Sequence, residues 1–359
     1  MFDGRMIVFP EIGKDPDWMK NITANPHVVI YGNGTRWSGR ALASRVQDLK
    51  DPILGAFQRK YGLAVVKQRY WGQKRYARVE IHSQAKEDPV ELTYGDLEVA
   101  FDGVAATYDA HILGNPMNLW LRNRSVALLS KLFKPGDTVI EIGCGTGTET
   151  LQLARKGVKV LATDISSRML EVMMNKAKSY DLASLVVPIH CRPYELRTRL
   201  SEAGYTEVDG AYSTYGAVNT EPRLPVMIEN LHALVRGGGK LALGVWNKFC
   251  LFEILGYATR ARPSMMVARL KNPVPVGKSR FCVSTNSFSV GELDAVVGKW
   301  FIPEKVIGVE VILPPSNLAR YLPSGVLGEL VLALDKALES HFPWNRLGDH
   351  FLRVYSKRS

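Results

Sequence analysis

The sequence predicts an α/β protein in two parts: a small β-rich module, then a larger domain built on a parallel sheet. Apolar strand-like runs alternate with amphipathic helix-like runs from about residue 138 onward, which is typical of parallel strands wrapped by helices. Before about residue 95, the strand-like runs are short, and only one helix-like stretch occurs between them. A chain of 359 residues is long enough for two domains. We therefore expect domains over residues 1–95 and 96–359.

The predicted linker is the polar run SQAKEDPVELTYG, residues 83–95, which carries a proline and follows neither the helical nor the strand period. Before it, four runs favour strands (MIVFPE, HVVIYGNG, TRWSGRALASRV and YARVEIHS) and DPILGAFQRKYG favours a helix. After it, strands and helices alternate from TVIEIG to KLALGVWN, and three glycines at 237–239 are expected to end a helix and lead into a strand at Lys240. Two further strand-like runs, EKVIGVEVIL and HFLRVYSK, complete this domain.

The composition is that of an ordinary folded protein, with 46% apolar and 23% charged residues. No apolar run reaches the ~20 residues that a membrane span requires, and the first residues lack the pattern of a secretory signal, so we expect a cytoplasmic protein. Four widely spaced cysteines without a C-x-x-C pair favour reduced thiols and argue against a disulfide framework and a metal site. The net charge of +11 fits either an anionic partner or a solvated basic surface.

A glycine-rich turn follows the first strand of the larger domain. The run TVIEIGCGTGTE, residues 138–149, holds Gly143, Gly145 and Gly147, and Glu141 precedes the first of them by two residues. A carboxylate there would repel the pyrophosphate of a dinucleotide, but it suits a ligand with a cationic amino group and no phosphate. S-adenosylmethionine (SAM) is such a ligand, and glycines would allow it to approach the backbone closely.

The residues after this turn add two predictions. Thr146 and Glu149 match the T-x-x-E capping box, which would start a helix just past the loop. Asp164 ends the next strand-like run, where a carboxylate would meet the ribose hydroxyls of a bound adenosine, and Ile165 would offer the adenine an apolar surface. The alternative is a tight turn beside two solvated strand-end acids. The loop and both acids together favour the SAM site.

Residues 101–357 resemble the class I SAM-dependent methyltransferases, through the stretch from FDGVAATYDAHI to VLATDISSRML and through VDGAYSTYGAVN and GDHFLRVYSK. The resemblance implies a Rossmann-like sheet of seven strands in the order 3-2-1-4-5-7-6. It also implies that the glycine turn holds the methionyl end of SAM, that Asp164 holds the ribose and that Tyr108 closes over the cofactor. The cofactor-binding residues expected in the turn are Glu141, Gly143, Cys144, Gly145 and Gly147.

The chain departs from the family pattern after the third strand. Many relatives place an acid and a small residue there to bind the adenine amino group, whereas this chain reads HCRPYEL, with Arg192 in the neighbourhood. The adenine contact is then made either by backbone atoms alone or by Glu195.

Methyl transfer from a sulfonium is a displacement on an already activated carbon, so alignment and exclusion of water can supply most of the acceleration. A base is needed only if the acceptor must lose a proton. The predicted catalytic residues are His111, close to Tyr108, and Tyr215, after the fourth strand. His232 and His350 are the other candidates for a base.

The acceptor pocket is predicted in residues 246–281, which follow the fifth strand. Large apolar residues are mixed there with basic ones, and no carboxylate occurs between Glu253 and Glu292. This composition fits an anionic or amphiphilic small molecule, and it also fits an amphipathic lid helix with solvated arginines. The arginines concerned are Arg260, Arg262, Arg269 and Arg280. A later segment, residues 317–346, favours an amphipathic helix pair that covers the domain or forms a homodimer contact.

The N-terminal module resembles part of the split-barrel family of flavin- and deazaflavin-dependent oxidoreductases, through DPDWMKNITANPHVVIYGNGTRWSGRALASRV and FQRKYG. The family's earlier strands, which supply much of its phosphate binding, are missing. We therefore expect a structural or dimerising module that binds no flavin tightly. Basic and aromatic residues also alternate between Arg59 and Arg78, which resembles a nucleic-acid-binding surface.

Together these patterns predict a methyltransferase that uses SAM and acts on a small-molecule acceptor rather than a nucleic acid. One alternative is an RNA methyltransferase that binds RNA through its N-terminal module. Against it, the fourth strand is followed by STYGAVN and not by the Asn/Asp-Pro-Pro-Tyr/Phe motif typical of base-amino methylation. The other alternative is a non-catalytic scaffold protein that binds SAM.

Overall fold

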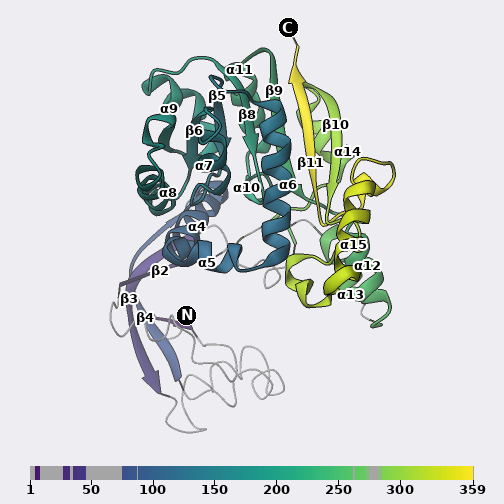
Figure 1. Cartoon of the computed structure of the whole chain (residues 1–359). Coiled ribbons are helices and arrows are strands. Elements are labelled where there is room, and N and C mark those ends of the chain that lie inside the picture. The colour runs from purple at the N-terminus through teal and green to yellow at the C-terminus, as the bar shows by residue number, and fades with distance from the viewer. Residues whose placement is uncertain are drawn as a thin grey trace. The chain divides into compact units, whose positions relative to one another are not determined.

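The structure is a computed structural model that describes residues 5–8, 27–32, 35–45, 75–86, 88–261, 263–271, 273–274, 283 and 285–358 (Figure 1). By its internal contacts, the chain divides into two compact units, Met1–Leu92 and Thr93–Ser359.

The segment that was expected to be an irregular linker is regular in the structure. Strand β4 covers Arg75–Lys86, and helix α4 covers Pro89–Val104. The polar end of β4 is held by pairing with β3, since Thr35 lies opposite Lys86. Pro89 stands at the first helical position, where its missing N–H costs no hydrogen bond. Tertiary pairing and a helix-starting proline therefore override the weak local pattern.

The N-terminal unit contains an antiparallel sheet in the order β1-β4-β3-β2. Besides β4, its strands are β1 (Arg5–Val8), β2 (His27–Gly32) and β3 (Thr35–Arg45). These match the four strand-like runs of the sequence. The helix expected over residues 51–62 and the basic residues from Arg59 to Lys74 lie outside the described residues. The split-barrel resemblance stays a prediction.

The second unit is built on a sheet of seven strands in the order β10-β11-β9-β8-β5-β6-β7. Strands β5 to β9 pair in parallel, whereas β11 is antiparallel to both β9 and β10. Counted along the chain, this is the order 3-2-1-4-5-7-6, so the predicted topology is confirmed. The strands are β5 (Thr138–Ile142), β6 (Lys159–Asp164), β7 (Val186–His190), β8 (Val208–Ser213), β9 (Val235–Trp246), β10 (Phe301–Val309) and β11 (His350–Lys357).

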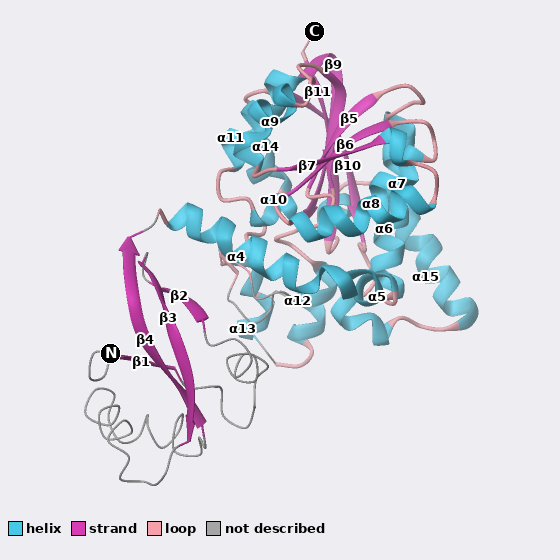
Figure 2. Ribbon diagram, turned by 90° about the vertical axis from the view of Figure 1, so that its left-hand side faces the viewer, coloured by secondary structure: helices cyan, strands magenta, loops and turns pink. Residues whose placement is uncertain are grey.

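Helices cover both faces of this sheet (Figure 2). One core forms where α9, α11 and α14 pack on the strands, and the other where α6, α7 and α8 pack on the opposite face. The helices of the unit other than α4 are α5 (Tyr108–Leu113), α6 (Pro116–Leu132), α7 (Thr148–Ala154), α8 (Ser167–Ser179), α9 (Leu196–Glu202), α10 (Ala217–Thr220), α11 (Leu224–Leu234), α12 (Leu251–Ala258), α13 (Pro263–Met266), α14 (Val290–Val297) and α15 (Gly325–Leu338). Among the described helices, none is long and apolar enough to cross a membrane.

Two local predictions for this unit are wrong. The glycines at 237–239 lie inside β9, which starts directly after α11, and a register shift between Val208 and Gly210 accommodates them. The segment expected to form a helix pair contains one α-helix, α15, preceded by a 3-10 helix over Ser316–Tyr321.

Each of the two edge strands of the sheet carries a proline. Strand β7 pairs only with β6 and carries Pro188. Strand β10 pairs only with β11, exposes Ile302 to Lys305, and has an irregular register between Pro303 and Lys305.

Candidate cofactor and acceptor site

A cavity of about 740 Å³ lies at the carboxyl ends of the parallel strands. Its lining includes a residue at or just after the end of each of these strands: Gly143, Asp164, Cys191, Tyr215 and Trp246. Ligands of open α/β sheets bind at this edge. The antiparallel strand β11 begins at the same edge, because its first residue pairs with the last residue of β9. The cavity therefore has two ends, one at the strands β5 and β6 and one at β9 and β11.

The glycine loop, residues 143–147, bends tightly between β5 and α7. Gly143, Gly145 and Gly147 have φ angles of 68°, 53° and 81°, a region that residues with a Cβ rarely adopt. A Cβ on Gly143 would lie 2.5 Å from the Cβ of Ala217, and one on Gly147 would lie 2.4 Å from the Cγ of Met173. Backbone conformation favours glycine at all three positions, and close contacts also disfavour a Cβ at Gly143 and Gly147. The loop presents Gly143 and Gly145 to the cavity.

The capping box predicted for α7 is wrong. The N-cap of the helix is Gly147, and no side chain caps it. Thr146 donates a hydrogen bond to Asp109 instead, and Glu149 forms a buried ion pair with Arg122. The left-handed Gly147 starts the helix one residue later than a Thr146 cap requires, and the ion pair draws Glu149 away from the helix terminus.

Asp164 connects the glycine loop to the turn after β6. Its Oδ2 accepts a hydrogen bond from the N–H of Gly145 at 2.8 Å, and its Oδ1 accepts one from the N–H of Ser166 at 2.9 Å. Burial raises the pKa of Asp164, and these two backbone donors oppose that shift. Asp164 and Ile165 both line the cavity. The structure thus brings these two residues and the glycine loop together.

Tyr108 lies over the glycine loop. A Cβ on Gly145 would be 4.0 Å from the Cε1 of Tyr108, and both residues line the cavity. The helix that begins at Tyr108 is held there by its next residue, since Asp109 also pairs with Lys176 of α8 at 2.7 Å.

Glu141 does not line the described cavity, although it was expected to face the ligand. It is 1% exposed, and its Oε2 accepts hydrogen bonds from Thr150 and from Tyr212, the latter at 2.8 Å. Burial and the nearby Glu149 raise the pKa of Glu141 to about 8. The carboxyl group therefore fastens β5 to α7 and β8 beneath the loop.

Two further residues expected at the cofactor lie outside the cavity wall. Cys144 is buried in the core between the sheet and α7. Its backbone supports the loop, since its N–H donates to the carbonyl of Thr163 and its carbonyl accepts from the N–H of Gly147, both at 2.9 Å. Glu195 accepts a hydrogen bond from the N–H of Arg192 at 2.9 Å and closes a capping box. The cavity wall after β7 is formed by Cys191 and Pro193.

Of the two predicted catalytic residues, the structure describes the side chain of Tyr215 but not that of His111. His111 lies in α5, and its side chain is outside the described residues. Tyr215 lines the cavity, but its hydroxyl donates to the carbonyl of Leu121 at 2.7 Å and also contacts Ser125. Burial raises the pKa of Tyr215, so the phenol stays protonated at neutral pH and cannot accept a proton there. Its ring meets that of His350 edge-on at 5.3 Å.

The far end of the cavity combines apolar side chains with charged ones, among them Glu253, Arg269, Asp349 and His350. We call its apolar part the apolar chamber, which is lined by Trp246, Tyr257, Met265, Val274 and Val283. Four of these five belong to residues 246–281, the segment that was predicted to form the acceptor pocket, and Val283 follows that segment by two residues.

The arginines of that segment provide less free positive charge than the sequence suggests. Arg269 is 5% exposed and pairs with Glu253 at 2.8 Å and with Asp349. Its guanidinium also lies 4.5 Å from the ring centroid of Trp246. Arg260 is exposed and stacks on Tyr321. Arg262 and Arg280 lie outside the described residues.

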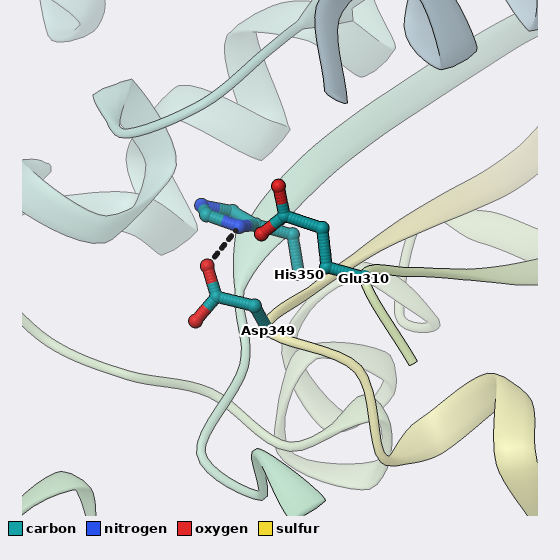
Figure 3. Close-up of side chains that lie close together, drawn as sticks. All are labelled: Glu310, Asp349 and His350. Carbon is teal, nitrogen blue, oxygen red and sulfur yellow. Dashed lines mark ion pairs between the residues drawn. The ribbon is translucent and has the colours of Figure 1, made fainter. Parts of the chain in front are cut away.

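Sequence reasoning missed several residues of the far end. Asn219 bonds both the N–H of Trp246 at 2.9 Å and the carbonyl of Asn286 at 2.7 Å, and so joins β9 to the loop before α14. Glu310 follows β10 directly and is 1% exposed beside Asp349 and His350 (Figure 3). Burial and the nearby Asp349 raise the pKa of Glu310. The signal in the sequence was an acid inside the apolar run VIGVEVILPP.

Residues 139–239, from β5 into β9, match the family model described as "Methyltransferase domain". The match includes the glycine loop and Asp164. These residues form a SAM-dependent methyltransferase domain.

Curated relatives of the methyltransferase domain cover only part of this chain. The chain is 32% identical to the demethylmenaquinone methyltransferase of Beutenbergia cavernae over 151 residues, which are 41% of this chain and 57% of the relative. It is 50% identical to the ribosomal RNA small subunit methyltransferase A of Leuconostoc mesenteroides over 50 residues, which are 14% of this chain and 17% of the relative. The chain thus spans little more than half of the first relative and less than a fifth of the second.

A solved structure similar to this chain is the geranyl diphosphate C-methyltransferase from Streptomyces coelicolor, with a TM-score of 0.49 at 14% identity. The similarity covers 76% of this chain and 100% of that chain.

Proposed function

We propose that the protein transfers the methyl group of SAM to a small, mostly apolar acceptor that carries a polar reacting group. The observation that carries the proposal is the cavity of about 740 Å³, which joins the glycine loop and Asp164 to the apolar chamber. Its volume falls in the range of about 300–1,000 Å³ typical of small-ligand sites. One cavity can therefore hold the methyl donor and the acceptor side by side.

In the proposed complex, SAM occupies the end of the cavity at β5 and β6. Asp164 accepts hydrogen bonds from the ribose with the oxygen lone pairs that its two backbone donors leave free. The backbone at Gly143 and Gly145 receives the methionyl end, and Tyr108 covers the reacting centre. Glu141 acts on the ligand only through the loop that it supports.

The acceptor is proposed to be amphiphilic rather than simply anionic. Its apolar body would lie in the apolar chamber, and its reacting oxygen or nitrogen near Asp349 and His350, which line the same end. Arg269 does not offer a free cation to an anionic head group, because two carboxylates already bind it. Catalysis then rests on alignment of acceptor and methyl group in a closed site.

Calorimetry tests the cofactor half of the proposal. SAM should bind the full chain with one site, and Asp164→Ala should weaken binding by about 1–3 kcal/mol, the cost of leaving polar partners unpaired. Glu207→Ala, which removes a carboxylate from an exposed position, is the control. Tight binding of NAD together with no binding of SAM would overturn the assignment.

Transfer of label tests the acceptor half. The protein is incubated with methyl-labelled SAM and a cell extract, and the extract is then divided into an organic phase, a nucleic acid precipitate and a protein precipitate. We expect label in the organic phase that resists ribonuclease. Label in RNA would favour the RNA methyltransferase, and SAM binding without transfer to any fraction would favour the scaffold protein.

We further infer that residues 1–95 form a split-barrel-like module that shapes assembly or substrate access, and that residues 96–359 form the catalytic domain. The antiparallel sheet of β1 to β4 supports this assignment. We expect no tightly bound flavin, so a protein that purifies yellow with stoichiometric flavin would contradict the inference.

A further inference from the structure

We propose that Glu310, Asp349 and His350 form a binding site for a divalent metal ion at the acceptor end of the cavity. One ligand atom from each of these residues lies within 4.8 Å of the others. Figure 3 shows the three side chains converging on one point. In the part of the chain that the structure describes, no other three His, Cys, Asp or Glu residues meet in this way.

The backbone holds the three residues together firmly. Val309, the last residue of β10, pairs with His350, the first residue of β11. Glu310 follows Val309 and Asp349 precedes His350, so the two acids lie next to this residue pair at the end of the ladder. The N–H of Asp349 donates to the carbonyl of Glu310 at 3.0 Å. A site built at the end of a sheet ladder is rigid, as a metal site requires.

Two potential ligand atoms in the cluster are buried without a hydrogen bond. Oε1 of Glu310 has no hydrogen-bond partner, although the residue is 1% exposed. Nδ1 of His350 lies 2.9 Å from Oδ2 of Asp349, yet it makes no hydrogen bond of acceptable geometry. Buried polar atoms are nearly always satisfied, so these two atoms call for a further partner. A cation between them and Asp349 would satisfy all three residues.

The carboxylates around the cluster outnumber the cations. Arg269 is the arginine that pairs with Asp349, and it is shared with Glu253. Glu310 adds a further buried carboxyl group, and the negative charge of Asp335 on α15 raises the pKa of that group. Carboxylates therefore outnumber the one guanidinium, and buried charges of one sign are costly unless they coordinate a metal or take up protons.

The ligand set indicates the class of ion. Two carboxylates and one imidazole suit Mn²⁺ or Zn²⁺ better than Ca²⁺, which takes oxygen ligands almost alone. No metal site was predicted from the sequence, but that prediction came from the spacing of the cysteines. Cysteine spacing carries no information about a site made of two carboxylates and a histidine.

The coordination leaves room for a substrate. Three protein ligands leave coordination positions open, and Asp349 and His350 face the cavity. If the proposed function holds, on which this step rests, those positions would take two neighbouring oxygen atoms of the acceptor. The substrate class is then an apolar molecule with vicinal hydroxyls, or with a hydroxyl next to a carbonyl.

Titration of Mn²⁺ into the chelator-treated full chain tests the site, with electron paramagnetic resonance to count bound ions and Zn²⁺ as a competitor. We expect one Mn²⁺ per chain, displaced by Zn²⁺. Glu310→Gln should weaken binding by at least about 10-fold. Glu304→Gln makes the same change on β10, the strand that leads to Glu310, at a glutamate paired with Lys240, and should leave binding unchanged.

SAM affinity and the thermal unfolding midpoint, measured on the same samples, show whether each variant is folded. If Glu310→Gln does not fold, His350→Gln replaces it. Absence of Mn²⁺ and Zn²⁺ binding by the wild type, or equal binding by the wild type and the cluster variant, overturns the proposal. A wild type that binds SAM but no ion refutes only the metal site, whereas one that binds the ion but no SAM refutes only the proposed function.

Discussion

The two ends of the cavity are built in different ways. At the cofactor end, the glycine loop and Asp164 come from short turns after neighbouring parallel strands, and their contacts are mainly with backbone N–H groups. At the acceptor end, Arg269, Glu253 and Asp349 come from distant segments and are held together by charge. The first end therefore depends on backbone shape and the second on buried ion pairs. Each should fail in its own way when a single residue is changed.

The largest effect is expected at the acceptor end. Arg269→Leu removes the guanidinium that pairs with Glu253 and Asp349, so two buried carboxylates lose their cation. We expect a loss of about 3–5 kcal/mol in the free energy of unfolding, measured by urea denaturation.

The matched control for this variant is Arg236→Leu, which breaks a half-exposed pair with Asp209 at 2.8 Å. Surface pairs contribute about 0–1 kcal/mol, so this change should be small. Equal losses in the two variants would show that buried charge is not what holds the acceptor end together.

A smaller effect is expected from Gly143→Ala at the cofactor end. The new Cβ would lie 2.5 Å from that of Ala217, on a backbone with a φ of 68°. Strain and overpacking together should cost about 2–4 kcal/mol of stability and weaken SAM binding, as measured by denaturation and calorimetry.

Gly136→Ala separates strain from crowding, because Gly136 has a φ of 93° but nothing within 4 Å of an added Cβ. This control should cost only about 1 kcal/mol and leave SAM affinity unchanged. If both alanine variants lose the same stability, the contact with Ala217 does not matter.

The pH dependence of stability tests the support beneath the loop. The pKa of Glu141 is raised from 4.5 to about 8. The folded protein therefore keeps a proton that the unfolded chain releases, and stability falls as pH rises from about 4.5 to about 8, by up to about 1.4 kcal/mol per pH unit. Glu141→Gln has no such proton to lose.

We therefore expect wild type and Glu141→Gln to diverge between about pH 5 and about pH 8 in denaturation experiments, with the wild type losing stability relative to the variant. Glu207→Gln, at an exposed position, should run parallel to the wild type. If the stability of Glu141→Gln also followed the same pH dependence as that of the wild type, the raised pKa of Glu141 would be contradicted.

The smallest effect is expected at Glu195. Its carboxylate caps a short helix and does not line the cavity, so Glu195→Gln should change SAM affinity by less than about twofold. Asp164→Ala serves as the positive control in the same calorimetric series. A large loss of affinity in the Glu195 variant would place the adenine against that carboxylate and revive the original expectation.

Much of the cofactor end could be predicted from the sequence because it is local. The glycines need positive φ angles within a few residues, and Asp164 ends a strand that neighbours β5, so both leave a pattern in a short window. The direction of Glu141 could not be predicted, since it depends on Tyr212 from a strand much later in the chain.

The acceptor end is hidden from sequence reasoning for a related reason. Glu310 and Asp349 meet only because β10 and β11 pair antiparallel, and each residue alone reads as an ordinary strand-end acid. Arg269 was correctly placed in the acceptor segment, but its two carboxylate partners could be found only from the fold.

The prolines of the two edge strands bear on how the chain behaves at high concentration. An open sheet edge can add a strand from a neighbouring molecule, which is the first step toward fibrils. Pro188 on β7 and Pro303 on β10 have no N–H to offer such a strand, and the irregular register after Pro303 disturbs the ladder further. Both borders of the sheet therefore resist strand-by-strand growth between molecules, a protection that matters most while newly made chains are crowded together.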